Sequence, residues 1–282
     1  MATGGDPDAA VVDRLGRRGT ICFGTRPRRR SVRGVAASRT KHAAQPHPPK
    51  RADVAPPIPA YCRPAAFGAF HRALADRDAP LGLFRAAAAI SLHAIPEADV
   101  HGASAAVEGI AHTVQTRARS GSADGRLAHL HDVLFEVIGL RGAEEDYYNP
   151  ANSYLPVVLS ARRGIPIALS LIYRTAACLV GLNAVGVNAP GHFLAGVDLP
   201  NKKRMYVDPF YGGALLDEGE VFQRITATTG QPIPPSPELL RTATPDQWLS
   251  RMLMNLQAVF AQTGAERDLY AMQELHALLE TH

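Results

Sequence analysis

Two residues in the stretch GHFLAGVDLPNKKRMYVDPFYGG, residues 191–213, have types suited to acid–base chemistry. The stretch is typical of two short strands joined by a polar turn, with His192 opening the first strand and Asp208 closing the second. Such a ribbon can bring the two side chains together. A carboxylate that holds an imidazole in one tautomer prepares it to act as a general base. His192 and Asp208 therefore form a candidate dyad, of a kind that normally serves a nucleophile.

The helix expected just before these strands supplies the candidate nucleophiles. Its start, RRGIPIALS, contains no cysteine, and its first hydroxyl is Ser170, which can instead bond to a backbone carbonyl. Cys178 lies twelve residues beyond Pro166, about 18 Å along the helix axis, and is better explained as a small core residue. Cys62 is a weaker candidate. The pair can equally be a structural link between two strands.

The remaining pattern predicts how these residues are held. Helical periodicity over 66–140 predicts a helical N-terminal lobe, and the largely apolar run 166–181 predicts a buried central helix. The period then changes to that of short strands at 184–189, 192–199 and 204–210. Residues typical of helix N-caps and a terminating glycine predict two further helices at the C-terminal end. The fold class is α+β, divided into a basic tail with a proline-rich linker (1–58), the helical lobe (59–145), a core of a buried helix on a small antiparallel sheet (146–235) and a helical hairpin (236–282).

Four segments together resemble a known family. They are NSYL at 152–155, RRGIP at 162–166, PGHF at 190–193 and DPFYGG at 208–213. With the helical segments around them, over roughly 66–282, they resemble the SirB family, a branch of the transglutaminase-like superfamily. The same module is found in one F-box protein of animals.

The resemblance implies a transglutaminase-like core with a tetratricopeptide-like C-terminal end. In cores of that layout a cysteine stands at the start of the buried helix, where the helix dipole and a histidine stabilise its thiolate. In this sequence the equivalent position falls near Ile165 or Pro166, so the resemblance implies that the catalytic cysteine is missing. His192 and Asp208 match the superfamily's remaining dyad. A fold is therefore implied more firmly than an activity.

Residues around the buried helix are candidates for binding. The stretch 147–153 can line a groove, or only cap a helix and fill a corner. Arg163 can grip an anionic ligand or lie in solvent at a helix end. The C-terminal helix pair can hold a peptide or only cap the core. The candidate binding residues are Tyr148, Asn152, Ser153, Arg163 and Asn188.

The charge is distributed unevenly along the chain. Residues 1–55 hold twelve Lys or Arg against four Asp, which leaves 18 basic and 22 acidic residues in the rest. With few large apolar residues, this tail is expected to be disordered, and can be an organellar transit segment, a plain extension or a nucleic-acid-binding arm. Too few aromatic residues accompany its arginines for base stacking, so nucleic acid is a disfavoured partner.

Composition excludes several other classes. No apolar run approaches the ~20 residues of a membrane-spanning helix, so a soluble protein with no membrane partner is expected. The three cysteines lie far apart, which disfavours a disulfide framework and a zinc site. No metal or cofactor is expected.

The leading interpretation is a module without the catalytic cysteine that binds a protein or peptide and serves as an adaptor. The alternative is an acyl-transfer enzyme or peptide hydrolase in which His192 and Asp208 activate a hydroxyl, a water or the substrate's own nucleophile, with Ser170 as a weak candidate. We expect an organelle, a plastid or a mitochondrion, if the tail is a transit segment, and the cytoplasm otherwise.

Overall fold

A helical lobe makes up the first part of the described chain. The computed structural model describes residues 58–118, 121–200 and 203–282, so the predictions for the tail lie outside the described residues. No helix in the described ranges is both long enough and apolar enough to cross a membrane. The lobe's elements are α1 (Pro64–Leu74), α2 (Pro80–Ala89), the 3₁₀ turn η2 (Ile90–His93), α3 (Val100–Arg117), α4 (Ala123–His131) and the π-helical η3 (Asp132–Val137).

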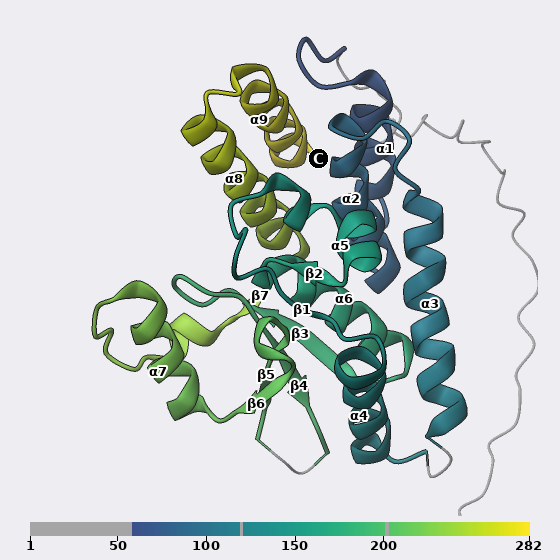
Figure 1. The fold of residues 1–282 in the computed structure, drawn as a ribbon, viewed down its shortest axis with the longest axis vertical. Helices are drawn as coiled ribbons and strands as arrows, with labels where there is room; N and C mark the ends of the chain where they lie inside the picture. Colours follow the sequence, from purple (N-terminus) through teal and green to yellow (C-terminus); the bar gives the residue numbers. More distant parts are fainter. Residues whose placement is uncertain (1–57, 119–120, 201–202) are drawn as a thin grey trace, which may run out of the picture. The chain divides into compact units, whose positions relative to one another are not determined.

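The helix α6 (Pro166–Leu179) lies at the centre of the fold, between the helical lobe and the sheet (Figure 1). It begins at a proline, which lacks the backbone N–H that a first turn would leave unsatisfied. Eleven of its fourteen residues are buried, and it contacts α2 and α3 on one side and the sheet on the other. The predicted central buried helix is confirmed. Short elements lead into it: β1 (Arg141–Gly142), the 3₁₀ turn η4 (Pro150–Ser153), α5 (Leu155–Ala161) and β2 (Arg163–Gly164).

The main sheet is antiparallel, in the order β6-β5-β4-β3-β7. One face packs on α6 and the large core of the helical lobe, through residues such as Phe193, Ala195 and Val207. The other face carries a separate small core in which Val187, Leu194 and Tyr206 pack against α7. The strands are β3 (Asn183–Val187), β4 (Leu194–Asp198), β5 (Met205–Asp208), β6 (Ala214–Leu216) and β7 (Thr242–Ala243).

The α+β class and the three predicted strands are confirmed, but β4 begins two residues after His192, which lies in the preceding turn segment instead of opening the strand. The structure also adds elements that the sequence pattern did not predict. β6 and β7 are the two edge strands, and the 3₁₀ turn η5 (Pro209–Tyr211) follows β5. α7 (Glu218–Thr229) begins at a capping box between Asp217 and Glu220. It covers the face of the sheet that α6 leaves free.

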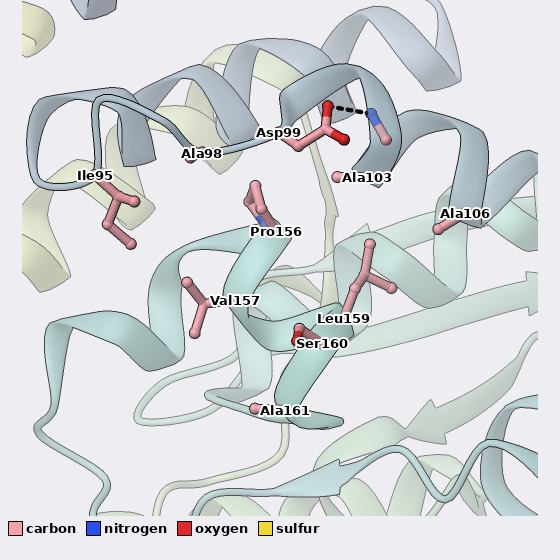
Figure 2. Close-up of a pocket in the computed structure, with 11 residues that line it drawn as sticks. Ile95, Ala98, Asp99, Ala103, Ala106, Pro156, Val157, Leu159, Ser160 and Ala161 are labelled. Carbon is pink, nitrogen blue, oxygen red and sulfur yellow. Dashed lines mark hydrogen bonds between the residues drawn. The ribbon is translucent and has the colours of Figure 1, made fainter.

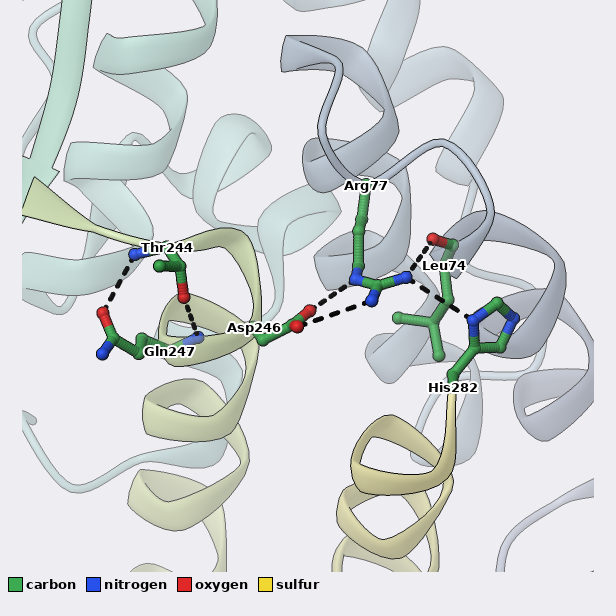
Figure 3. Close-up of polar contacts among 6 residues, drawn as sticks. All are labelled: Leu74, Arg77, Thr244, Asp246, Gln247 and His282. Carbon is green, nitrogen blue, oxygen red and sulfur yellow. Dashed lines mark hydrogen bonds and ion pairs between the residues drawn. The ribbon is translucent and has the colours of Figure 1, made fainter.

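The C-terminal helices α8 (Pro245–Thr263) and α9 (Glu266–Thr281) form the expected antiparallel pair (Figure 1). Figure 3 shows how the start of α8 is fixed: Thr244 and Gln247 form a capping box, and Asp246 pairs with Arg77 from the turn after α1. The Arg77 guanidinium also donates to the carbonyl of Leu74, at 2.9 Å. These contacts tie the hairpin to the helical lobe.

Trp248 from α8 is wedged between α6 and the sheet. It is 1% exposed, its indole N–H lies 3.4 Å from the carbonyl oxygen of Ile167, and its ring centroid lies 4.7 Å from that of Phe193. The ring lies directly over Gly186 in β3, where an added Cβ would come within 2.2 Å of it. A side chain at position 186 and this indole cannot both keep their places.

We therefore expect Gly186→Ala to lower the free energy of unfolding by about 3 kcal/mol, because the overpacked methyl group forces Trp248 or β3 to shift. Trp248 is the only tryptophan, so urea unfolding can be followed by its fluorescence. Gly109→Ala is the matched control: Gly109 is exposed within α3 with open space around it, and alanine should raise stability by about 0.5–1 kcal/mol. Equal effects of the two substitutions would contradict the packing described.

His131 links α4 to the central helix. Its Nε2 lies 2.9 Å from the hydroxyl oxygen of Tyr173 in α6, and the rings of Tyr173 and Phe135 contact it edge-on. Burial lowers the pKa of His131 to about 4. The unfolded chain, with a pKa near 6.5, binds the proton first as the pH falls. The neutral ring thus supports folding above pH 6.5, and this support is lost between pH 6.5 and 4.

Wild-type protein should therefore lose about 2 kcal/mol more stability than His131→Gln when the pH is lowered from 7 to 5, at about 1.4 kcal/mol per unit of pKa difference. The measurement is the free energy of urea unfolding at both pH values for both proteins. If the two proteins lose the same amount, the pKa of His131 is not depressed in the folded state.

Candidate functional site

His192 and Asp208 meet as the sequence pattern suggested. The Nε2 of His192 lies 2.9 Å from Oδ2 of Asp208, and the residues are 5% and 0% exposed. The other carboxylate oxygen accepts the backbone N–H of Phe210 at 3.2 Å. Nε of Arg224, in α7, lies 3.5 Å from Oδ2. Two hydrogen bonds and the Arg224 guanidinium thus partner a fully buried carboxylate, which holds the imidazole in place.

The strand register explains why the two side chains share a face. Ala195 pairs with Val207, so one more step would set Leu194 opposite Asp208. His192, two residues before Leu194, then falls on the same face as a diagonal neighbour. A turn completes the approach: Gly191 has φ +69°, and the N–H of His192 donates to the carbonyl of Ala189 at 3.2 Å.

A cleft of about 590 Å³ opens beside the imidazole, and we call it the dyad cleft. Its walls come from four parts of the chain: the loop before η4, the start of α6, the turn at residue 191 with η5, and the end of α7. The lining residues are Glu144, Tyr147, Tyr148, Pro166, Gly191, His192, Phe210, Tyr211 and Thr228. The start of α6 therefore faces the same space as His192, which is the geometry that a nucleophile at that helix end would need.

The candidate nucleophiles do not line this cleft. Ser170 is fully buried and its hydroxyl donates to the carbonyl of Phe193, at 3.2 Å. Cys178 lies near the other end of α6, with its Sγ 3.4 Å from the carbonyl oxygen of Ala184. Cys62 lies before α1, and burial together with nearby Glu274 raises the pKa of its thiol to about 12. Thr228 does line the cleft, but its hydroxyl donates to the carbonyl of Arg224 within α7.

At the start of α6, the position near which the resemblance put the missing cysteine is occupied by Ile165 and Pro166. Ile165 is 5% exposed, and Pro166 lines the dyad cleft. Neither side chain carries a group that can attack a carbonyl or be deprotonated.

A second hollow of about 110 Å³ adjoins the dyad cleft, and we call it the tyrosine hollow. The two spaces share Tyr147 and Tyr148 as lining residues. Its other lining residues are Asn149, Ser153, Ile165, Asn255, Ala258, Val259 and Gln262, so α8 forms one wall. The C-terminal hairpin thus contributes to the site as well as covering the core.

Of the candidate binding residues, Tyr148 lines both spaces and Ser153 lines the tyrosine hollow. The other three do not line either one. Asn152 bonds through its side chain to the carbonyl of Asp146, and Arg163 is exposed in β2. Asn188 accepts a hydrogen bond from Arg251 at 2.7 Å.

Several residues that line the two spaces were not among the candidate binding residues. Tyr211 lies inside the DPFYGG segment. Glu144, Thr228 and the α8 residues are distant from that segment in sequence. One signal was present: Asp217 and Glu220 have the spacing of a capping box, which would have predicted α7 and with it Arg224 and Thr228.

Another hollow, of about 530 Å³, lies between α3 and α5 (Figure 2). Its lining is mostly small and apolar, and its one charged side chain is already engaged. Asp99 accepts the backbone N–H of Gly102 at 2.7 Å and so caps α3. No cluster of three or more His, Cys, Asp or Glu that could hold a metal ion occurs among the residues that the structure describes.

Comparison with known proteins agrees with this geometry. The family model described as transglutaminase-like superfamily matches residues 101–254, which contain both dyad residues. A UPF0162 protein of Xylella fastidiosa is 37% identical over 143 residues, 49% of this chain and 50% of that protein. The F-box only protein 21 of Mus musculus is 30% identical over 153 residues, 50% of this chain and 23% of that protein.

The chain thus spans about half the length of the UPF0162 relative. The match to an F-box protein agrees with the resemblance noted from the sequence. No solved structure matches the chain. The family model covers more than half of the sequence, and this chain belongs to the transglutaminase-like superfamily.

Proposed function

We propose that this chain is a SirB-type transglutaminase-like module that binds a protein or peptide segment in the dyad cleft and acts as an adaptor without catalysing a reaction. One observation carries the proposal: the histidine–aspartate pair is intact, but the helix start that faces it is Ile165-Pro166. A cleft that keeps its shape and loses its nucleophile is suited to holding a ligand unchanged.

The lining of the cleft supports binding to a polypeptide. Tyr147, Tyr148 and Tyr211 are 37%, 68% and 45% exposed, although large aromatic side chains are usually buried more completely. Tyrosine gives a large contact area at a small entropic cost, and it is enriched where proteins bind one another. Because the tyrosine hollow continues the dyad cleft through shared residues, an extended segment can occupy both.

In this proposal the dyad is a polar anchor. When Nε2 of His192 donates to Asp208, Nδ1 is the ring nitrogen that remains to meet a ligand. A backbone N–H of a bound segment can donate to that nitrogen. The hydrogen bond between His192 and Asp208 would orient the imidazole of a catalytic base. Here it holds the same ring in position to orient the ligand.

We expect Tyr148→Ala to weaken the binding of cleft ligands at least about tenfold, because it removes an exposed aromatic anchor shared by both spaces. Peptides would be selected from a displayed random library against the full chain, and their Kd measured by fluorescence anisotropy. Tyr270→Ala is the control, since Tyr270 is 41% exposed on α9 and lines neither space. Equal losses in the two variants, or no selectable peptide, would contradict the proposal.

The second candidate function is an acyl transferase or peptide hydrolase that uses the dyad on water or on the substrate's own nucleophile. The observation that favours it is the intact 2.9 Å hydrogen bond beside an open cleft. We expect no turnover of fluorogenic peptide amides and esters above the rate of His192→Gln, which retains a polar side chain beside Asp208. Trp248 fluorescence would show that the variant is folded. A wild-type rate tenfold or more above that of the variant would establish the enzyme instead.

A further inference from the structure

An unbroken chain of aromatic rings runs along the dyad cleft. Tyr148 contacts Tyr147 with ring centroids 5.3 Å apart, Tyr147 contacts Phe210 at 6.0 Å, and Phe210 contacts Tyr211 at 5.1 Å. The imidazole of His192 closes the series, 6.2 Å from Tyr211. All five residues line the same cleft, and we call them the aromatic belt. Neighbouring rings that meet edge to face also support one another's positions.

One carboxylate lies at the surface of the cleft lining. Glu144 is exposed and lines it, whereas no Lys or Arg from the described part of the chain is among its lining residues. The buried carboxylate of Asp208 is neutralised from behind by Arg224 and bonded to His192. The guanidinium of Arg251 is bonded to Asn188 and lies outside the lining.

The belt already holds one cation. The guanidinium carbon of Arg224 lies 4.0 Å from the ring centroid of Tyr211, well within the range of a cation–π contact. That contact occupies Tyr211. Tyr147, Tyr148 and Phe210 have no such cation within the described part of the chain, while Glu144 adds a negative charge beside them.

We propose that the dyad cleft binds an alkylated ammonium group, such as a trimethyllysine side chain, on the segment that it holds; this rests on the proposed function. Aromatic rings attract an organic cation through their negative faces, and a carboxylate adds charge attraction. A primary ammonium would need up to three hydrogen-bond acceptors, whereas a trimethylammonium needs none and is desolvated at a smaller cost. The cleft volume of about 590 Å³ leaves space for the backbone that carries this group.

The test compares two short acetylated peptide amides bound to the full chain, measured by calorimetry. One carries trimethyllysine, and the other carries the neutral side chain in which carbon replaces the quaternary nitrogen. We expect the cation to bind at least fivefold more tightly than its neutral isostere. Glu144→Gln and Tyr148→Ala should each weaken the cationic peptide three- to tenfold, and Tyr148→Phe, which keeps the ring, should restore its binding.

Glu145→Gln is the matched control, because Glu145 is the exposed neighbour of Glu144 and does not line the cleft. It should leave the affinity unchanged. Equal binding of the cation and its isostere, or equal losses in Glu144→Gln and Glu145→Gln, would overturn the inference. If neither probe binds while library-selected peptides still bind through Tyr148, the ammonium assignment fails and the proposed function stands. If no peptide of any kind binds, both fail.

Discussion

The packing of α6 between the helical lobe and the sheet determines where every part of the site lies. One face of the sheet is covered by this helix, and Trp248 enters at the contact because Gly186 leaves space for its ring. The start of α6 is thereby brought to the strand ends that carry His192 and Asp208. A helix displaced by one turn, about 5.4 Å, would put a different residue in front of the imidazole. The site therefore depends on a contact made outside it.

The dyad could be predicted from sequence, because strand alternation decides which residues share a face. The pattern predicts that His192 and Asp208 can meet, and the hydrogen bond between them has the length expected of such a pair. The sequence also indicates that the Ser170 hydroxyl can bond to a backbone carbonyl. The carbonyl is that of Phe193, just before β4, a partner that only the packing of α6 on the sheet provides.

The cleft could not be predicted in the same way. Its walls come from Glu144, Pro166 and Thr228, which are separated by tens of residues and brought together by tertiary packing. β7 is only two residues long, which is too short to have a recognisable period. Its pairing with β3 depends on tertiary packing. Asn152 and Arg163 looked suited to binding by residue type, but the local backbone directs them to structural contacts or to solvent.

Two of the walls of the dyad cleft belong to different hydrophobic cores. The start of α6 is part of the large core, whereas α7, which supplies Thr228 and Arg224, rests on the small core across the sheet. Elements held by few apolar contacts open and repack at a lower cost in free energy than elements packed in the large core. Substitutions in α7 can therefore change the width and charge of the cleft while the fold remains intact. Ligand preference can diverge among such modules more readily than their architecture.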